Sequence, residues 1–179
     1  GRWTISNRPD GGDARLFGYG DGGDLARCGD WDGNGTETPA VLRGTTWFMA
    51  NTVGIPVANH LVEFGDQGDV GVVGDWDGDG VDTIGVFRSG TWFLTDDIYV
   101  GRASIVFGYG NPVGDHPVVG DWNGDGRSEP AVVRNGWWYL ATSVGQPHAA
   151  KVFQYGDAGD VPIAGRWTST NRQTPGIVR

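Results

Sequence analysis

The chain has almost no cysteine and no long hydrophobic run, and each absence limits what it can be. Cys28 is the only cysteine, so no disulfide can form within the chain, and cysteine pairing says nothing about its redox compartment. No apolar stretch approaches the roughly 18 residues that a membrane-spanning helix needs. We therefore expect neither a disulfide-stabilised fold nor a membrane span.

Positive charge is also scarce. The 179 residues include 13 Lys and Arg against 22 Asp and Glu, which gives a formal net charge of -9. Affinity for nucleic acids depends mainly on basic residues that neutralise phosphates, so this balance argues against a nucleic-acid partner. We expect bound metal to offset much of the negative charge.

Runs of strong helix formers are rare, whereas the chain contains 33 Gly, 9 Pro and 9 Trp. This composition favours short strands joined by tight turns. A chain of 179 residues that is 38% hydrophobic can build one core, so we expect a single all-β domain over residues 1–179.

Three acidic loops share one pattern, Asp-Trp-Asp/Asn-Gly-Asp/Asn-Gly, and begin at Asp30, Asp75 and Asp121. Each loop places carboxylate or amide oxygens at alternate positions before a glycine that can adopt a positive φ. Ca²⁺ prefers roughly six to eight oxygen ligands, which alternate side chains and a backbone carbonyl on a tight turn can supply. The pattern therefore predicts about three calcium ions per chain.

The loops belong to a repeat of about 45 residues. A fourth copy, at residues 165–171, keeps the Gly-x-Trp frame but lacks the acidic ligands. Each repeat has an apolar run before the loop, a second run that ends in Arg, a Gly-rich turn of the hairpin type, and two further runs. The last of these runs ends on Phe64, Phe107 and Phe153. We expect four strands per repeat.

The two ends of the chain supply complementary parts of one repeat. Residues 1–17 match the third and fourth runs, and the chain stops at Arg179, after the second run of the fourth copy. This arrangement predicts a four-bladed β-propeller whose closing blade is shared between the termini. The expected blades are residues 24–64, 69–107, 115–153, and 160–179 together with 1–17; a fragment of an array and a larger oligomeric ring are the alternatives.

Several residues recur at fixed places in the repeat. Eight of the nine tryptophans do so, and we expect them to pack between blades. An Asp precedes each first strand and an Arg ends each second strand, so each pair lies at one edge of its blade, opposite the acidic loops. We expect these pairs to form a structural ring rather than an anion site; they are Asp24 and Arg43, Asp69 and Arg88, Asp115 and Arg134, and Asp160 and Arg179.

Departures from the repeat are the candidates for ligand specificity. Arg27 replaces an apolar residue and either lines a channel or ligand site or makes a compensating structural pair. Its neighbour Cys28 is expected to be a small buried hydrophobe. Trp137 either stacks on a ligand or is structural. Four residues form either a sugar- or peptide-contacting surface or simple turn packing: Tyr19, Tyr109, Tyr155 and His116.

The acidic loop after an apolar strand resembles the FG-GAP or VCBS repeats of integrin-type β-propellers, especially copies in secreted bacterial proteins. The resemblance covers the whole chain and implies calcium ligands at loop positions one, three, five, seven and nine. In this sequence those positions are Asp30, Asp32, Asn34, Thr36 and Thr38; Asp75, Asp77, Asp79, Val81 and Thr83; and Asp121, Asn123, Asp125, Arg127 and Glu129. The residues at position seven would bind through their carbonyls.

Position nine is usually Asp in that family, and here only Glu129 is acidic. Glu37 and Asp82 lie one place earlier, so either the loop geometry differs or those two sites bind less tightly. In the fourth copy, Arg166 would place its guanidinium where the cation sits in the others. No helices flank the loops and no Glu occupies position twelve, which excludes an EF-hand.

The sequence favours a binding protein over an enzyme. The three histidines fall at unrelated places in their repeats, no Gly-x-Ser-x-Gly motif occurs, and carboxylates committed to Ca²⁺ are poor proton shuttles. We expect a secreted, monomeric domain of a larger protein that binds glycan or an extracellular protein. The alternatives are an enzyme or enzyme-appended domain with substrate at a central channel near Arg27, and a structural spacer.

Overall fold

The computed structural model describes residues 1–6, 8, 10–146, 148–167 and 171–179, and within them the chain is all-β. Sixteen strands form five antiparallel sheets, and consecutive strands in the chain are neighbours in each sheet. No helix of membrane-spanning length and hydrophobicity occurs among these residues. The expected all-β class is therefore confirmed.

Three of the sheets have four strands each and follow the predicted repeats. The first contains β3 (Leu25–Gly29), β4 (Thr38–Arg43), β5 (Thr46–Met49) and β6 (His60–Glu63). The second contains β7 (Val70–Gly74), β8 (Thr83–Arg88), β9 (Thr91–Leu94) and β10 (Ile105–Gly108). The third contains β11 (His116–Gly120), β12 (Glu129–Arg134), β13 (Trp137–Leu140) and β14 (Lys151–Gln154).

The remaining two sheets are hairpins formed by the ends of the chain. The N-terminal hairpin pairs β1 (Arg2–Ile5) with β2 (Arg15–Gly18), and the C-terminal hairpin pairs β15 (Val161–Gly165) with β16 (Thr174–Val178). In the described residues these hairpins are two separate sheets, with no pairing between β16 and β1. Each hairpin forms through contacts local in sequence, whereas joining them requires a contact between the two ends of the chain.

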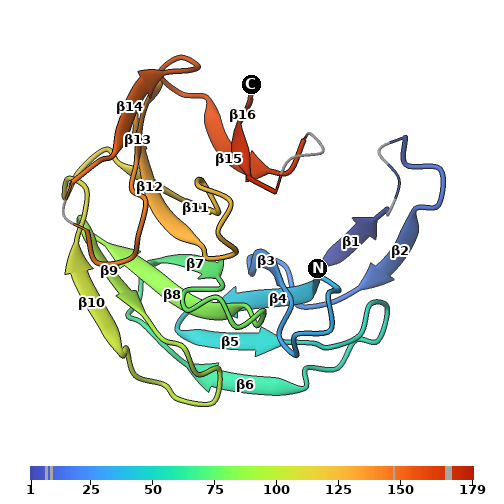
Figure 1. Cartoon of the computed structure of the whole chain (residues 1–179). Helices are drawn as coiled ribbons and strands as arrows, with labels where there is room; N and C mark the ends of the chain where they lie inside the picture. Colours follow the sequence, from blue (N-terminus) through green and yellow to red (C-terminus); the bar gives the residue numbers. More distant parts are fainter. Residues whose placement is uncertain (7, 9, 147, 168–170) are drawn as a thin grey trace.

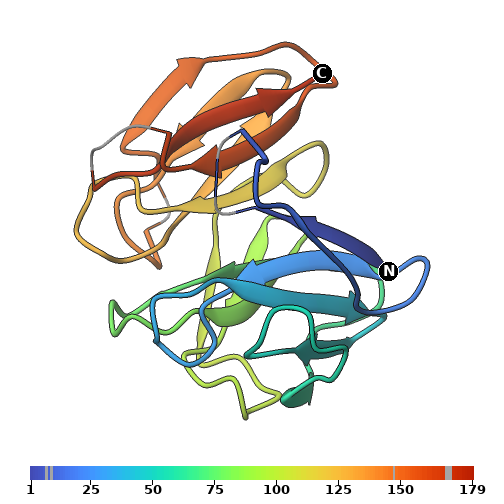
Figure 2. The same ribbon diagram turned by 90° about the vertical axis from the view of Figure 1, so that its right-hand side faces the viewer.

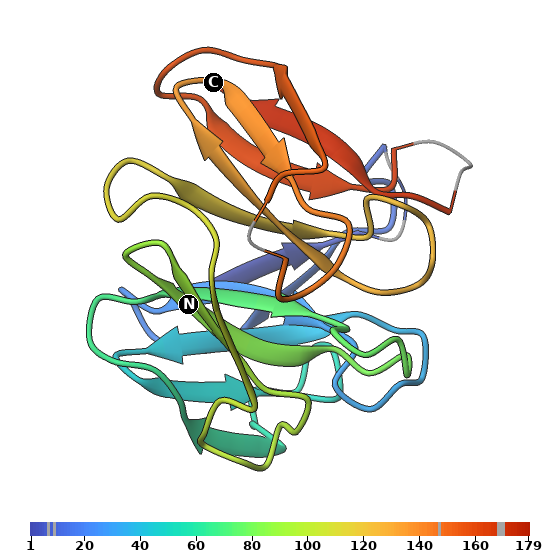
Figure 3. The same ribbon diagram turned by 60° about the vertical axis from the view of Figure 1, so that its left-hand side comes forward.

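The sheets follow one another in chain order around an arc, with the two hairpins at its ends (Figure 1). The first strands face the inside of this arc, where β3 contacts β7, β7 contacts β11, and β11 contacts β15. Viewed from the open side, the C-terminal hairpin lies above the N-terminal hairpin (Figure 2). Viewed from the opposite side of the arc, the second and third sheets come forward (Figure 3).

The apolar core lies between successive sheets. One buried cluster joins Trp31 and Trp47 of the first sheet to Ile84 and Val86 of the second, and each of these side chains is at most 2% exposed. Burying a large apolar side chain contributes about 1.5–3 kcal/mol, so these contacts are the main attraction between sheets. Six of the eight recurring tryptophans are buried in this way; Trp3 is only partly buried, and Trp167 is 56% exposed.

The Asp and Arg pairs predicted from the repeat are present in all four copies. An Arg Nε lies 2.5–3.2 Å from an Asp oxygen in each pair, and the Asp side chains are at most 11% exposed. In three copies the guanidinium also stacks on the aromatic ring of the third strand, at 4.8–5.3 Å from the centroids of Phe48, Phe93 and Tyr139. Because each Arg is already paired, the structural interpretation is supported over an anion site.

We predict that one of these pairs contributes acid-sensitive stability. The Arg43 hydrogen bond lowers the pKa of Asp24 to about 2, below its unfolded value of about 3.9. The stability from this pair is therefore present above about pH 4 and is lost as the pH falls through about 2. Asp24→Asn should lower the melting temperature by about 2–4 °C at pH 7, since solvent screens the half-exposed Arg43, and by less at pH 2.

Thermal unfolding followed by circular dichroism at both pH values measures this effect. The matched control is Asp10→Asn, because Asp10 pairs with Arg8 in a bridge exposed on both sides. That control should leave the melting temperature within about 1 °C of the parent. An equal loss for Asp24→Asn at pH 7 and pH 2 would contradict the prediction.

Candidate metal centre

The acidic loops connect the first strand of each four-stranded sheet to the second. The strand register places Leu25 opposite Leu42, so Asp24 and Arg43 share one edge of the sheet, while the loop that joins Gly29 to Thr38 lies at the other. The second and third sheets have the same register. The predicted separation of the acidic loops from the Asp and Arg pairs is therefore observed.

Each loop is wound around the carboxylate at its first position. Asp75 accepts hydrogen bonds from the backbone N–H groups of Gly78 (2.6 Å), Asp79 (3.2 Å) and Gly80 (2.9 Å). Asp30 and Asp121 each accept two such bonds in their own loops. Gly78 and Gly80 have φ values of 80° and 87°, a region that L side chains rarely adopt. The loop conformation is therefore held by its own hydrogen bonds.

Two loops bring three carboxylates close together. One oxygen from each of Asp75, Asp77 and Asp79 lies within 4.8 Å of the others, and the same holds for Asp121, Asp125 and Glu129. The carboxylates repel one another at this separation, and a cation placed among them would replace this repulsion with attraction. A donor set made only of oxygen suits a hard cation, so both clusters could hold a metal ion. The first loop has only Asp30 and Asp32 at the corresponding positions.

Position nine differs among the loops as the sequence indicates. Glu129 is 1% exposed, and its carboxylate accepts hydrogen bonds from the Trp122 N–H (2.9 Å) and the Asn123 side-chain amide (2.6 Å). Burial raises its pKa to about 7, and the charges of Asp125 and Asp121 act in the same direction. The hydroxyls of Thr38 and Thr83 instead donate to the carbonyls of Gly29 and Gly74, both at 3.2 Å.

The residue at position eight contacts the neighbouring loop instead of its own. The Asp82 carboxylate accepts from the backbone N–H of Asp30 (2.9 Å), and the Asp82 N–H donates to the Asp30 carbonyl (2.8 Å). We call this reciprocal pair of hydrogen bonds an inter-loop latch. Asp82 lies at position eight, one place before the expected metal ligand, and its carboxylate therefore joins neighbouring sheets.

Asp96 is a further acidic residue near the second loop, and the sequence pattern did not single it out. It follows β9, and its pKa is raised by burial and by the charges of Asp77, Asp79 and Asp75. The equivalent residue of the third sheet is Thr142, whose carbonyl accepts a hydrogen bond from Asn123 at 3.4 Å. The segment after each third strand thus lies beside the acidic loop, which only the tertiary structure shows.

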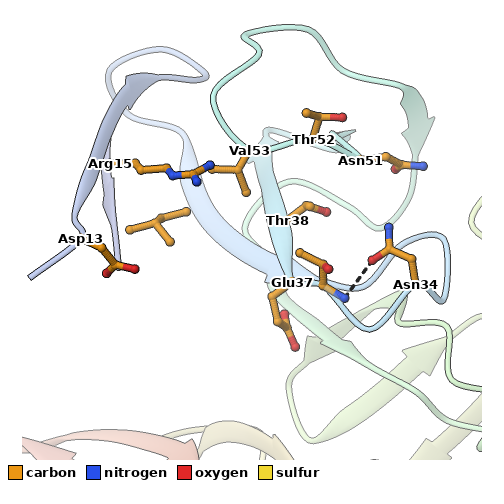
Figure 4. Close-up of a pocket in the computed structure, with 10 residues that line it drawn as sticks. Asp13, Arg15, Asn34, Glu37, Thr38, Asn51, Thr52 and Val53 are labelled. Carbon is orange, nitrogen blue, oxygen red and sulfur yellow. Dashed lines mark hydrogen bonds between the residues drawn. The ribbon is translucent and has the colours of Figure 1, made fainter. Parts of the chain in front are cut away.

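A pocket lies beside the first loop, between that loop, the N-terminal hairpin and the segment after β5 (Figure 4). Asp13 and Arg15 line one side, Asn51 and Thr52 line another, and Glu37 belongs to the loop itself. A corresponding pocket beside the third loop is lined by Asp125, Glu129 and Thr142. Acidic and basic side chains line both pockets, so each pocket suits a polar ligand or a hydrated ion.

The proposed aromatic surface is only partly present. Tyr19 and Tyr109 are 4% and 5% exposed, because they pack on the second strand of the next sheet. They therefore favour the turn-packing interpretation, and a ligand surface made of all three tyrosines is not formed. Tyr155 and Trp137 are 47% and 43% exposed. Both lie at the end of the third sheet where β13 begins and β14 ends. His116 is also exposed.

Arg27 has structural partners. Its Nε donates to the Gly71 carbonyl of β7 (2.9 Å), and a terminal nitrogen donates to the Ala26 carbonyl (2.7 Å), so it bridges the first strands of two sheets. Arg27 was expected either to line a channel or ligand site or to make a compensating structural pair, and these contacts match the structural role. Cys28 is exposed, contrary to the expectation of a buried hydrophobe, whereas its equivalents Val73 and Val119 are half-buried.

Residues 168–170 of the fourth loop lie outside the described residues. No protein-family model matches the chain, and no curated protein matches it either. The geometry of the loops is therefore the main indication of function.

We predict that Glu129 makes stability depend on pH when no metal is bound. The pKa of Glu129 is about 7 in the folded protein, above its unfolded value of about 4.5. The stability that the protonated side chain contributes is therefore present below about pH 4.5 and is lost as the pH rises through 7. In chelator, the melting temperature of the parent should fall by about 3–6 °C between pH 6 and pH 8, and Glu129→Gln should abolish this fall.

Melting curves of the parent and the variant in chelator test this prediction. Glu63→Gln is the matched control, because Glu63 is exposed on β6 and lies outside the acidic loops. The parent and the control should show the same pH dependence. A variant that keeps the full pH dependence would show that Glu129 does not cause it.

Proposed function

We propose that this protein is a calcium-stabilised, non-catalytic binding module. The observation that supports this most strongly is the recurrence of clustered carboxylates in equivalent loops of two successive sheets, at Asp75, Asp77 and Asp79 and at Asp121, Asp125 and Glu129. One cluster could be a chance feature of an acidic surface. Two clusters at the same place in the repeat favour selection for a cation.

Calcium is the proposed cation because every donor in the clusters is oxygen and the loops contain no histidine or cysteine. The carbonyls of Val81 and Arg127 would add neutral donors, as the resemblance to FG-GAP or VCBS repeats implies. The first loop would complete a weaker third site through Asn34, the Thr36 carbonyl and Thr38. Bound calcium supplies positive charge that offsets carboxylate repulsion and stabilises the folded state by linkage.

The proposed architecture is a four-bladed propeller of the FG-GAP or VCBS type, with the two terminal hairpins as halves of the fourth blade. The common repeat, the arc of sheets and the contacts between first strands support it. Secretion is proposed with it, since extracellular calcium is abundant enough to fill sites of modest affinity.

A binding role is proposed over catalysis. The exposed rings of Trp137 and Tyr155 offer apolar faces beside polar groups, a combination that suits a glycan or an extracellular protein. Arg27, the residue that suggested a substrate channel, is engaged by backbone carbonyls. No residue of the acidic loops is proposed as an acid or base.

Calcium titration of the chelator-treated protein tests the proposal. We predict two to three calcium ions per chain by calorimetry, and a rise in melting temperature of about 5–10 °C at saturation. Asp77→Ala combined with Asp79→Ala should remove one ion and lower the melting temperature in calcium, with little effect in excess chelator.

Asp10→Ala is the control for this pair of substitutions, because it removes an exposed acid distant in sequence from the loops. It should leave the calcium stoichiometry unchanged. An equal loss of stability with and without calcium would show that Asp77 and Asp79 are structural and that the metal proposal is wrong.

A further inference from the structure

Two cavities lie at equivalent places in the repeat, at the edge of the sheets that carries the Asp and Arg pairs. The first has a volume of about 300 Å³ and lies between the turn after β2 and the first sheet. The second has a volume of about 440 Å³ and lies between the turn after β6 and the second sheet. Sites for small organic ligands are typically about 300–1,000 Å³, so each cavity has room for one small ligand.

The two cavities share a set of side chains. Each has an Asp from the turn, an Arg that ends the second strand and a Phe from the third strand. These are Asp21, Arg43 and Phe48 in the first cavity, and Asp66, Arg88 and Phe93 in the second. The recurrence of this set in successive sheets indicates that the cavity is a feature of the repeat and not of one loop.

The charged groups of the shared set are already paired. The Arg43 guanidinium lies 2.7 Å from an Asp21 oxygen and 2.8 Å from an Asp24 oxygen, and the equivalent contacts in the second cavity are 2.6 and 2.7 Å. An anionic ligand would compete with two carboxylates for the guanidinium, and a cationic ligand would compete with the guanidinium for the carboxylates. Arg102 lines only the second cavity, so it does not define what the two cavities share. The shared set therefore favours a neutral ligand.

An aromatic ring forms an apolar wall of each cavity. Phe48 and Phe93 are half-buried, and the Arg Cζ atoms lie 5.0 and 4.8 Å from their ring centroids, so a cation–π contact holds each ring. The Asp21 and Asp66 side chains are 75% and 72% exposed, so their carboxylates can accept further hydrogen bonds. A ligand that matches both walls has an apolar face and hydroxyl groups at its edge. A sugar ring has this combination, because its C–H groups form a face and its hydroxyls project from the rim.

The first cavity also contains a polar group without a partner. Tyr19 lines this cavity and is 4% exposed, and its hydroxyl has no hydrogen-bond partner among the residues that the structure describes. Buried polar side chains are normally hydrogen-bonded, so a ligand hydroxyl in the cavity would supply the partner that Tyr19 lacks. Phe64 takes the same place in the second cavity and has no hydroxyl. The first cavity therefore offers one more hydrogen bond than the second.

We infer that the two cavities are binding sites for a neutral sugar residue. In each, the Phe ring contacts the apolar face of the sugar, and the Asp of the turn accepts hydrogen bonds from its hydroxyls. In the first cavity, the Tyr19 hydroxyl forms a further hydrogen bond with the sugar. The inference rests on the binding role in the proposed function and gives that role a ligand class and two sites. Neither site includes a residue of the acidic loops.

Binding of neutral methyl glycosides to the full chain in calcium tests the inference. Saturation-transfer NMR with the methyl glycosides of glucose, galactose, mannose, fucose and N-acetylglucosamine should detect binding of at least one. Calorimetric titration with that glycoside should give about two sites per chain, the first about fivefold tighter because of the Tyr19 hydrogen bond. The methyl glycoside of glucuronic acid should bind more weakly. No binding by any neutral glycoside would favour an extracellular protein as the ligand and overturn the inference, as would tighter binding of the glucuronide.

Filling each cavity tests where the sugar binds. Ala58 and Ala103 line the first and second cavities, so Ala58→Leu should remove the tighter site and Ala103→Leu the weaker one. Ala158→Leu is the matched control, because Ala158 is exposed on a turn outside both cavities, and it should leave both sites intact. Unchanged binding in Ala58→Leu and Ala103→Leu would place the sugar elsewhere and overturn the inference.

Tyr19→Phe keeps the test decisive if a filled cavity prevents folding, because it removes only a hydroxyl that has no partner among the described residues. It should weaken the tighter site by about fivefold, and an unchanged affinity would overturn the assignment. Calcium titration of Tyr19→Phe reads the metal proposal separately. Normal calcium binding without sugar binding by the parent would overturn this inference alone, and sugar binding without calcium binding would overturn the metal proposal alone.

Discussion

The aspartate that begins each acidic loop organises both its own loop and the contact to the next sheet. Its side chain accepts hydrogen bonds from the N–H groups of the loop backbone. Its own N–H and carbonyl form hydrogen bonds with the residue at position eight of the following loop. Without this carboxylate the loop would leave several backbone donors without an acceptor. A single residue type at a single position therefore sets the local turn and the spacing between sheets.

The sheets themselves are held by a different force. Buried tryptophans and branched side chains fill the space between successive sheets, and several of them are completely inaccessible. These contacts are apolar and non-directional, so they attract neighbouring sheets without fixing their register. The hydrogen bonds between loops at one edge supply direction between sheets, because hydrogen bonds tolerate little displacement. At the other edge, each Asp and Arg pair ties the first strand to the second within one sheet.

The repeat made most of the secondary structure predictable. Periodic Gly-x-Trp frames and Arg-terminated runs located the first two strands of the three four-stranded sheets and both strands of the C-terminal hairpin. The Asp and Arg pairs followed from strand direction alone. Phe64 shows where alignment by residue type failed: it was aligned with Phe107, yet the register places Val62 opposite Trp47, where Phe107 lies opposite Trp92. Phe64 instead occupies the place of Tyr109.

The parts that could not be predicted depend on contacts between sheets. Asp82 looked like a displaced metal ligand, because a sequence shows the spacing within a loop but not which neighbouring loop a side chain meets. Tyr19 and Tyr109 looked like surface residues because they follow strands at turns, and only the position of the next sheet buries them. Asp96 was missed since its closeness to Asp77 depends on the fold of the whole second sheet.

The latches also bear on how the loops would respond to a cation. Asp82 belongs to the second loop and holds the first, while Asp75 of the second loop is held by Ser128 of the third. A cation that tightens one loop would therefore restrict the backbone of its neighbour before that neighbour is filled. Reduced conformational freedom in the empty loop lowers the entropy cost of its own occupancy, which is a basis for positive cooperativity. If the loops bind a cation, they would then act as one chelating array and fill over a narrower range of cation concentration than independent sites.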